Sequence, residues 1–207
     1  MRWAVGRNPR FRRFARLPDL TLTSRLRYSL PGQEKGETML PMPVADHAAI
    51  EEELSRTGKY VKVLWQSADT LMFIARGREY RSEFHINPSD EHMTMLKGKM
   101  NLHYRTPEGK EEVAVLNEGE TIYTAAGIPH SPRFPGDAFL LVGERMRRAG
   151  EVDRFQWFCP KCDAFLHEET FVVDDYTKDP VSQAYANFFD SEEFRTCKKC
   201  GTMHPRP

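Results

Sequence analysis

Two histidines and a glutamate are the residues of this sequence whose types and spacing best fit oxygen chemistry. His85 precedes Glu91 across the turn-forming stretch 87–90, and His130 follows the turn 127–129 about forty residues later. Two imidazoles and one carboxylate on one face of an ion leave three positions open, as in non-haem Fe(II) sites that activate O2. The sequence therefore predicts a metal centre at these three residues. Fe(II) is the expected ion, although Mn, Ni or Zn would accept the same ligands.

Four cysteines form two pairs with metal-ligand spacing near the end of the chain. Cys159 and Cys162 enclose two residues, Cys197 and Cys200 repeat that spacing, and 34 residues separate the pairs. Two such knuckles wrap a single ion tetrahedrally with four thiolates, so we predict a closed, structural site that holds iron or zinc. A thioredoxin-like redox pair is the alternative, and the βαβ pattern that it requires is missing. Reduced thiolates fit a cytoplasmic protein.

Short segments rich in β-branched and aromatic residues must position these groups, and Gly, Pro and Asn turns separate them. Eight segments are predicted to be strands, at residues 60–65, 70–75, 79–85, 93–96, 100–104, 112–116, 121–124 and 138–144. Short strands at this spacing indicate a β-sandwich or barrel, not a parallel α/β sheet. Two helices are expected, over residues 47–55 with Asp46 as N-cap and near residues 180–189.

The spacing of these residues resembles the motif of the cupin superfamily. Asn87 stands in place of the second cupin histidine, and the positions that match are His85, Glu91, Gly98, Gly119, Gly127 and His130. Within the cupins, the chain resembles the 3-hydroxyanthranilate 3,4-dioxygenases over about residues 60–207, through Trp65-Gln66, Arg81-x3-His85, Leu96-x-Gly98, Gly119-Glu120, Pro129-His130-Ser131-Pro132, Glu144-Arg145 and Phe155-x-Trp157-x-Cys159. Bacterial members of that family also end in a rubredoxin-like pair of Cys-x2-Cys knuckles. The resemblance implies an all-β fold, a cupin jelly-roll β-barrel with a small C-terminal rubredoxin-like tail that binds a metal through four cysteines.

The resemblance also implies a reaction and its cofactors. The chain is expected to be an Fe(II)-dependent dioxygenase that opens the ring of 3-hydroxyanthranilate, or of a closely related o-aminophenol carboxylic acid, in an extradiol-type reaction that inserts both atoms of O2. Fe(2+) would occupy the catalytic site and a second Fe, or Zn, the four-cysteine site. The family further implies a homodimer. A non-catalytic metal-binding cupin module or regulator and an O2-independent cupin isomerase or decarboxylase are the alternatives.

Three further residues fall at or near substrate-binding positions of the family. Arg81 is implied to bind the substrate carboxylate and Glu144 to pair with the amine and accept a proton. Arg81 and His85 lie four apart on a predicted strand and would share one face, and a guanidinium binds a carboxylate through two parallel bonds. A second family arginine falls on Phe134, whereas Arg133, a further substrate-binding candidate, stands one residue earlier and would face the opposite way unless a bulge intervenes. These departures predict a related aromatic substrate, either a substituted hydroxyanthranilate or another o-aminophenol or o-diphenol acid.

Charge is unevenly distributed along the chain, although 30 Lys+Arg balance 30 Asp+Glu. Residues 1–30 hold eight arginines and one acidic residue, which indicates translated upstream sequence with the start at Met39 or Met42, a basic arm, or a transit peptide. We predict a basic N-terminal extension and linker without a fixed fold over residues 1–43, a cupin catalytic domain over residues 44–152 and the rubredoxin-like tail over residues 153–207. The balanced charge argues against a nucleic-acid partner, and the lack of a long apolar run argues against a membrane. A small aromatic substrate and O2 are the expected partners.

Overall fold

The computed structural model of the chain describes residues 42–207 except residues 79, 179 and 180. Contacts between residues divide the chain into two units, 1–43 and 44–207, and every helix and strand described belongs to the second. The extension predicted for residues 1–43 lies outside the described residues, apart from residues 42 and 43. None of the helices in the described part is long and apolar enough to cross a membrane.

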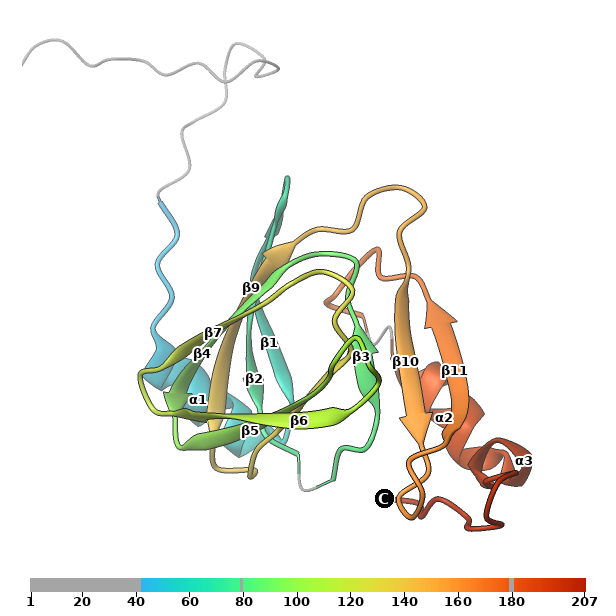
Figure 1. Cartoon of the computed structure of the whole chain (residues 1–207). Helices are drawn as coiled ribbons and strands as arrows, with labels where there is room; N and C mark the ends of the chain where they lie inside the picture. Colours follow the sequence, from blue (N-terminus) through green and yellow to red (C-terminus); the bar gives the residue numbers. More distant parts are fainter. Residues whose placement is uncertain (1–41, 79, 179–180) are drawn as a thin grey trace, which may run out of the picture. The chain divides into compact units, whose positions relative to one another are not determined.

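Two antiparallel sheets form the body of the second unit (Figure 1). The five-stranded sheet has the order β1-β2-β9-β4-β7 and consists of β1 (Val61–Ser67), β2 (Thr70–Arg76), β9 (Phe139–Arg145), β4 (Glu91–Lys97) and β7 (Thr121–Thr124). The six-stranded sheet has the order β11-β10-β3-β8-β5-β6 and consists of β11 (Phe165–Phe171), β10 (Asp153–Phe158), β3 (Phe84–Ile86), β8 (His130–Arg133), β5 (Lys99–Arg105) and β6 (Glu111–Asn117). This arrangement confirms the predicted all-β jelly-roll barrel.

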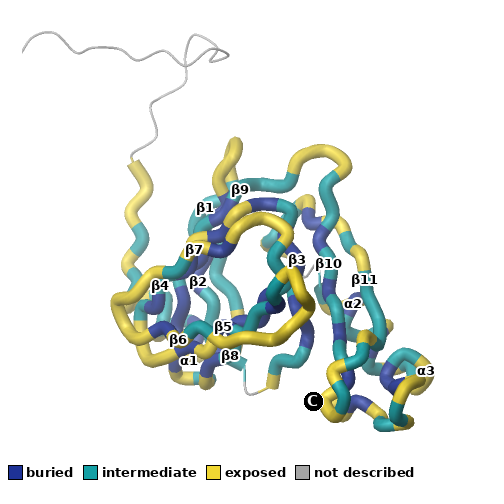
Figure 2. Tube along the Cα trace, viewed as in Figure 1, coloured by how far each residue is buried: buried dark blue, intermediate teal, exposed yellow. Residues whose placement is uncertain are grey.

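The main apolar core lies between the two sheets, where the tube of Figure 2 is dark blue. Along β4 the residues Glu91, Met93 and Met95 are buried, whereas His92 between them is exposed. Met93 and Met95 pack against inward side chains of the opposite sheet, namely Met100, Leu102 and Leu116. Side chains of a strand alternate between its two faces. The alternation that buries the methionines therefore also brings the carboxylate of Glu91 inside the barrel.

Helix α1 (His47–Thr57) packs on the other face of the five-stranded sheet, through Leu54 against Ile74 and Phe139. Asp46 caps the helix by accepting a hydrogen bond from the backbone N–H of Ala49, at 3.2 Å. The helix ends at Gly58, whose φ of 71° suits a residue without a Cβ. The helix predicted from the Asp46 cap is therefore present and extends two residues beyond its predicted end.

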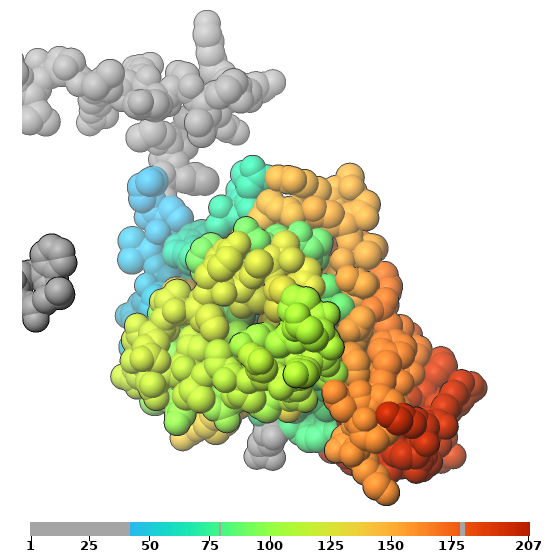
Figure 3. All heavy atoms as spheres, in the orientation of Figure 1, coloured from blue at the N-terminus to red at the C-terminus, as the bar shows by residue number. Residues whose placement is uncertain are grey.

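The C-terminal part of the chain continues the six-stranded sheet. Strand β10 pairs with β3 on one side and β11 on the other, and α2 (Ser182–Asp190) and α3 (Glu192–Arg195) follow. Trp157 of β10 stacks on Phe188 of α2 with 4.2 Å between the ring centroids. In Figure 3 this part, coloured orange to red, continues the surface of the barrel. Residues 44–207 form one compact unit by their contacts, and the division at residue 153 stays a prediction.

Candidate metal centre and its cavity

The three metal ligands predicted from the sequence lie together at one end of the barrel. His85 lies on β3 and is paired in register with His130, the first residue of β8, while Glu91 is the first residue of β4 in the opposite sheet. One ligand atom from each of the three residues lies within 4.8 Å of the other two. Glu91 and His130 are buried, and His85 exposes 12% of its side chain. Both sheets thus contribute to a single cluster of nitrogen and oxygen donors.

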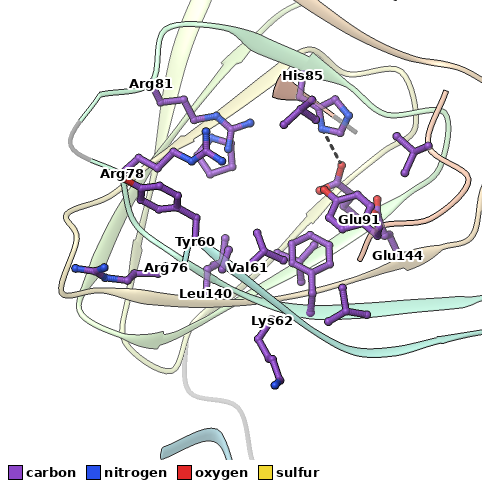
Figure 4. Close-up of a pocket in the computed structure, with 18 of the residues that line it drawn as sticks. Tyr60, Val61, Lys62, Arg76, Arg78, Arg81, His85, Glu91, Leu140 and Glu144 are labelled. Atoms are coloured by element: carbon purple, nitrogen blue, oxygen red, sulfur yellow. Dashed lines mark ion pairs between the residues drawn. The ribbon is translucent and has the colours of Figure 1, made fainter. Parts of the chain in front are cut away.

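Each imidazole is held through one ring nitrogen and turns the other toward Glu91. His85 Nε2 lies 2.6 Å from Asp153 Oδ1, and His130 Nδ1 donates to the carbonyl oxygen of Ile128 at 2.9 Å. The remaining nitrogens, His85 Nδ1 and His130 Nε2, lie 3.8 Å and 3.3 Å from Glu91 Oε1. Figure 4 shows the ring of His85 turned toward Glu91. Histidines that bind metals characteristically fix their second nitrogen on a carboxylate or a carbonyl in this way. The donor set and its outer contacts therefore fit a divalent metal ion.

The electrostatics of the cluster favour an ionised carboxylate between the imidazoles. Burial alone would raise the pKa of Glu91, but the nearby His130 and His85 hold that pKa well below its ordinary value. Burial lowers the pKa of His85, which favours the neutral imidazole that binds metals. The pKa of His130 is raised, because the carboxylate of Glu91 outweighs the effect of burial. A cation bound among the three groups would replace the protons that otherwise balance this charge.

Asn87, which replaces the second cupin histidine, positions two carboxylates. Its amide nitrogen donates to Glu91 at 2.5 Å and also to Glu144, and its carbonyl oxygen accepts from the backbone N–H of Ser89 at 2.8 Å. Asn87 is 1% exposed, so these hydrogen bonds are shielded from water. An amide at this position therefore orients Glu91 and Glu144 relative to each other.

A buried ionic network that the sequence analysis missed surrounds the cluster. The Arg147 guanidinium contacts Asp153 at 2.7 Å and Glu144 at 3.2 Å, and exposes only 4% of its side chain. Asp153 in turn holds His85, as described above. Although burial opposes ionisation, Arg147 and His85 keep the pKa of Asp153 below its ordinary value. No local motif marks Asp153 or Arg147, because Asp153 reaches His85 only through the pairing of β10 with β3.

A cavity of about 560 Å³ opens beside the cluster formed by His85, Glu91 and His130, which is called the metal cluster below. His85, Glu91, His130 and Glu144 are among the residues that line it, and Figure 4 shows His85, Glu91 and Glu144 together at one side. In Figure 4 the guanidinium groups of Arg78 and Arg81 point into the cavity from the opposite side. Its apolar walls consist of Val61, Val63, Phe73, Met93, Phe134, Leu140 and Val142. Cationic groups at one end, a metal cluster at the other and apolar walls between them suit a flat aromatic acid.

Arg81 faces the cavity for a different reason from the one predicted. The strand expected over residues 79–85 is limited to Phe84–Ile86, and Arg81 lies in the irregular segment before it. Its Nε lies 2.7 Å from Glu83 Oε1, and that carboxylate accepts a hydrogen bond from the hydroxyl of Tyr185 at 2.8 Å. Because Glu83 is 1% exposed, a buried ion pair, rather than strand alternation, orients Arg81.

Glu144 and Arg133 differ in their placement. Glu144 on β9 lines the cavity and is paired in register with Glu91. Burial and the charge of Glu91 raise the pKa of Glu144 to about 8, against the opposing effect of Arg147. Arg133 does not line the cavity, and its Nη1 lies 3.7 Å from Glu111. Phe134 lines the cavity in its place, and the substrate contact of Arg133 stays a prediction.

The four cysteines also converge. The Sγ atoms of Cys159 and Cys200 are 3.6 Å apart, as are those of Cys162 and Cys197, and all four thiols are free. A tetrahedral ion with bonds of about 2.3 Å separates its thiolates by about 3.8 Å, close to these spacings. The cluster joins the turn between β10 and β11 to the segment after α3. Four thiolates in this geometry fit a closed structural site.

Replacing Asp153 by asparagine is expected to weaken metal binding at the barrel site about 10- to 100-fold, because His85 loses the anionic partner that fixes its ring. Competition with a chromophoric chelator measures the affinity. Glu151→Gln is the matched control, since Glu151 pairs with Arg145 at 2.7 Å and does not touch either histidine. Equal metal affinities of Asp153→Asn and the control would contradict this role for Asp153.

An antiparallel two-sheet barrel with two histidines and one glutamate converging at one end defines a metal-binding cupin. The family model described as 3-hydroxyanthranilic acid dioxygenase matches residues 43–189. The chain therefore belongs to the 3-hydroxyanthranilic acid dioxygenase family.

Curated relatives agree with this assignment. A 3-hydroxyanthranilate 3,4-dioxygenase from Bacillus cereus is 37% identical over 144 residues, which cover 70% of this chain and 80% of that protein. The protein of the same name from Scheffersomyces stipitis is 33% identical over 168 residues, which cover 80% of this chain and 97% of that protein. Among solved structures, a cupin-2 domain protein from Shewanella frigidimarina aligns with a TM-score of 0.38 and 16% identity, over 47% of this chain and 92% of that one.

Proposed function

We propose that this chain is an Fe(II)-dependent ring-cleaving dioxygenase that acts on 3-hydroxyanthranilate or a closely related o-aminophenol carboxylic acid and inserts both atoms of O2. The observation that carries the proposal is the convergence of His85, Glu91 and His130 at one side of a cavity with Arg81 on the opposite side. Membership of the dioxygenase family supports the reaction type, and the named activity of the relatives supports the substrate class.

In this proposal His85, Glu91 and His130 hold the catalytic ion. Bound Fe(II) supplies Lewis acidity toward the phenol and amine of the substrate and a further open position for O2. The residues themselves keep the site ordered: Asp153 and the Ile128 carbonyl fix the two imidazole rings, and Asn87 fixes the carboxylate. The cysteine site holds iron or zinc and stabilises the C-terminal part.

Arg81 binds the substrate carboxylate in this scheme and thereby orients the ring. Its ion pair with Glu83 uses Nε, so the two terminal amino groups remain for a carboxylate. A planar guanidinium held by a buried partner loses little conformational freedom when the substrate binds. The apolar walls of the cavity exclude water from the two faces of the ring.

Glu144 is the proton-transferring group of the proposal. With a pKa of about 8, its carboxyl group is largely protonated near neutral pH. The group lines the cavity close to the metal ligands, within reach of a substrate amine or hydroxyl. Glu144 then exchanges a proton with the substrate, and Arg147 at 3.2 Å stabilises its ionised form.

Oxygen consumption tests the proposal directly. The protein is loaded with Fe(II) under nitrogen, and an oxygen electrode records uptake after 3-hydroxyanthranilate and air are added. We expect uptake equimolar with substrate, and mass spectrometry should find two labelled atoms in the product when 18O2 is used. Parallel assays with methylated, decarboxylated and deaminated analogues define the preferred ring. No uptake with any o-aminophenol acid would favour a non-catalytic module or an O2-independent enzyme instead.

A further inference from the structure

Arg78 lines the cavity and directly follows Gly77, whose backbone is closely packed. The segment leaves β2 at Gly77, whose backbone N–H donates to the carbonyl oxygen of Ala138 at 3.1 Å. A Cβ added at Gly77 would overlap the carbonyl oxygens of Phe134 and Pro135, so the chain passes this point without room for a side chain. The residue that follows is therefore presented to the cavity from a tightly held backbone.

Two aromatic rings hold the guanidinium of Arg78. The Cζ atom of Arg78 lies 4.7 Å from the centroid of the Tyr60 ring and 5.6 Å from the centroid of the Tyr185 ring. Contacts with ring faces stabilise a guanidinium without neutralising its charge, and they leave its N–H edges available for hydrogen bonds. Arg78 is thus oriented but keeps its capacity to bind an anion.

The charge of Arg78 is not balanced by an acidic residue of the described chain. Three other cations that line this cavity have acidic partners, since Arg81 pairs with Glu83, Lys62 with Glu53 and Lys178 with Asp175. Lys59 and Arg76 also line it without a carboxylate partner among the described residues, and the Nε of Arg76 donates to the carbonyl oxygen of Gly136 at 2.6 Å. No ion pair joins Arg78 to a carboxylate anywhere in residues 42–207, leaving aside residues 79, 179 and 180. A cation that faces a cavity without a counter-ion favours an anionic ligand.

Tyr185 of α2 brings the two arginines to one place. Its ring supports Arg78, and its hydroxyl donates to Glu83, which pairs with Arg81. Phe171 and Phe155 pack near this helix, so α2 is anchored on the six-stranded sheet. One residue therefore fixes two guanidinium groups on the same side of the cavity, opposite the metal cluster (Figure 4).

The chain at the end of β8 contributes an apolar ring, and not a cation, to the lining of the cavity. Phe134 occupies that position and lines the cavity, and Arg133 beside it pairs with Glu111 outside the cavity. A substrate carboxylate directed at this end of the cavity would therefore meet Arg81 and an apolar ring, unless another residue contributes. Arg78 points into the cavity from the same side as Arg81 (Figure 4) and has no carboxylate partner among the described residues, so it can supply a second cation there.

We propose that Arg78 is a second carboxylate-binding residue, which together with Arg81 selects aromatic substrates that carry a carboxylate next to the metal-chelating groups. This inference rests on the proposed function. It assigns substrate selectivity to a guanidinium from the segment after β2, supported by the C-terminal helix α2, rather than to an arginine of strand β8.

Anaerobic binding measurements test this inference without turnover. The full-length protein loaded with Fe(II) is titrated calorimetrically with 3-hydroxyanthranilate and with 2-aminophenol, which is the same ring without its carboxylate. Arg78→Gln removes the charge, and Arg78→Lys keeps the charge but lacks the planar guanidinium that binds a carboxylate through two hydrogen bonds. Lys62→Gln is the control, because it removes a cation of the cavity lining that is already paired with Glu53.

We expect Arg78→Gln to weaken the binding of 3-hydroxyanthranilate about tenfold or more, because one charge-assisted contact is lost. The binding of 2-aminophenol, which has no carboxylate, should weaken less than about twofold. Arg78→Lys should fall between the wild-type protein and Arg78→Gln, and Lys62→Gln should change neither ligand by more than about twofold. The inference is overturned when Arg78→Gln affects both ligands equally or neither, or when the wild-type protein does not prefer the carboxylated ring. Admission of O2 afterwards tests the dioxygenase proposal separately, since missing oxygen uptake in the wild-type protein leaves the binding comparison intact.

Discussion

Replacing His130 by alanine is expected to remove the metal ion from the barrel and to lower kcat/KM at least about a thousandfold, because loss of a ligand and of Lewis acidity costs several kcal/mol of transition-state stabilisation. His130 is 1% exposed and its Nε2 lies 3.3 Å from Glu91 Oε1, so the substitution removes one ligand from a buried site. The cysteine site is untouched by this substitution. Metal analysis should therefore fall from two ions per chain to one.

His103→Ala is the matched control for His130→Ala. His103 lies on β5 next to β8 in the same sheet and contacts Glu111 at 2.6 Å, but it does not line the cavity. We expect two ions per chain and unchanged kcat/KM for this variant. Turnover by His130→Ala comparable with that of the control would exclude a catalytic ion at this site.

Replacing Cys162 by serine is expected to destabilise the C-terminal part of the protein strongly. Structural sites of four thiolates contribute folding free energy directly, and loss of several kcal/mol lowers the Tm of a chain of this size by about 10 °C or more. The cluster ties the turn after β10 to the segment after α3. Differential scanning calorimetry together with metal analysis measures both effects.

Lys198→Ala provides the control for the cysteine site. Lys198 lies between Cys197 and Cys200, exposes 85% of its side chain and makes only a surface ion pair with Glu193 at 3.6 Å. Its loss should shift the Tm by no more than about 1 °C. A Cys162→Ser protein that melts with the control, or that retains its second ion, would show that the four thiolates do not hold a structural metal.

Local patterns predict a β-sandwich or barrel and a metal centre at His85, Glu91 and His130, whereas the choice of a jelly-roll barrel depends on the family resemblance. His85 and Glu91 are six residues apart across a turn, and the alternation along β4 fixes which side of the sheet Glu91 faces. Alternation also explains why Arg133 and Phe134 face opposite ways. In contrast, β8 has the sequence His-Ser-Pro-Arg, which carries no apolar alternation, and it was not predicted as a strand.

Contacts between distant segments could not be predicted from these patterns. Asp153 is 68 residues from His85 in sequence, and Tyr185 is 102 residues from Glu83. Arg81 lies outside any strand, so its orientation depends on a buried ion pair and not on backbone periodicity. The residues that position the ligands and the arginines are therefore found only once the sheet order and the packing of α2 are known.

The pairing of β10 with β3 sets the order in which the site can be assembled during synthesis. The ligands His85, Glu91 and His130 leave the ribosome before Asp153, and Tyr185 emerges later still. Strands of the barrel can pair with each other first. The ring of His85 lacks its Asp153 partner, and Arg78 and Arg81 lack the support of Tyr185, until the C-terminal segment has folded onto the barrel. A nascent chain therefore acquires a binding-competent centre only after both Asp153 and Tyr185 have been synthesised.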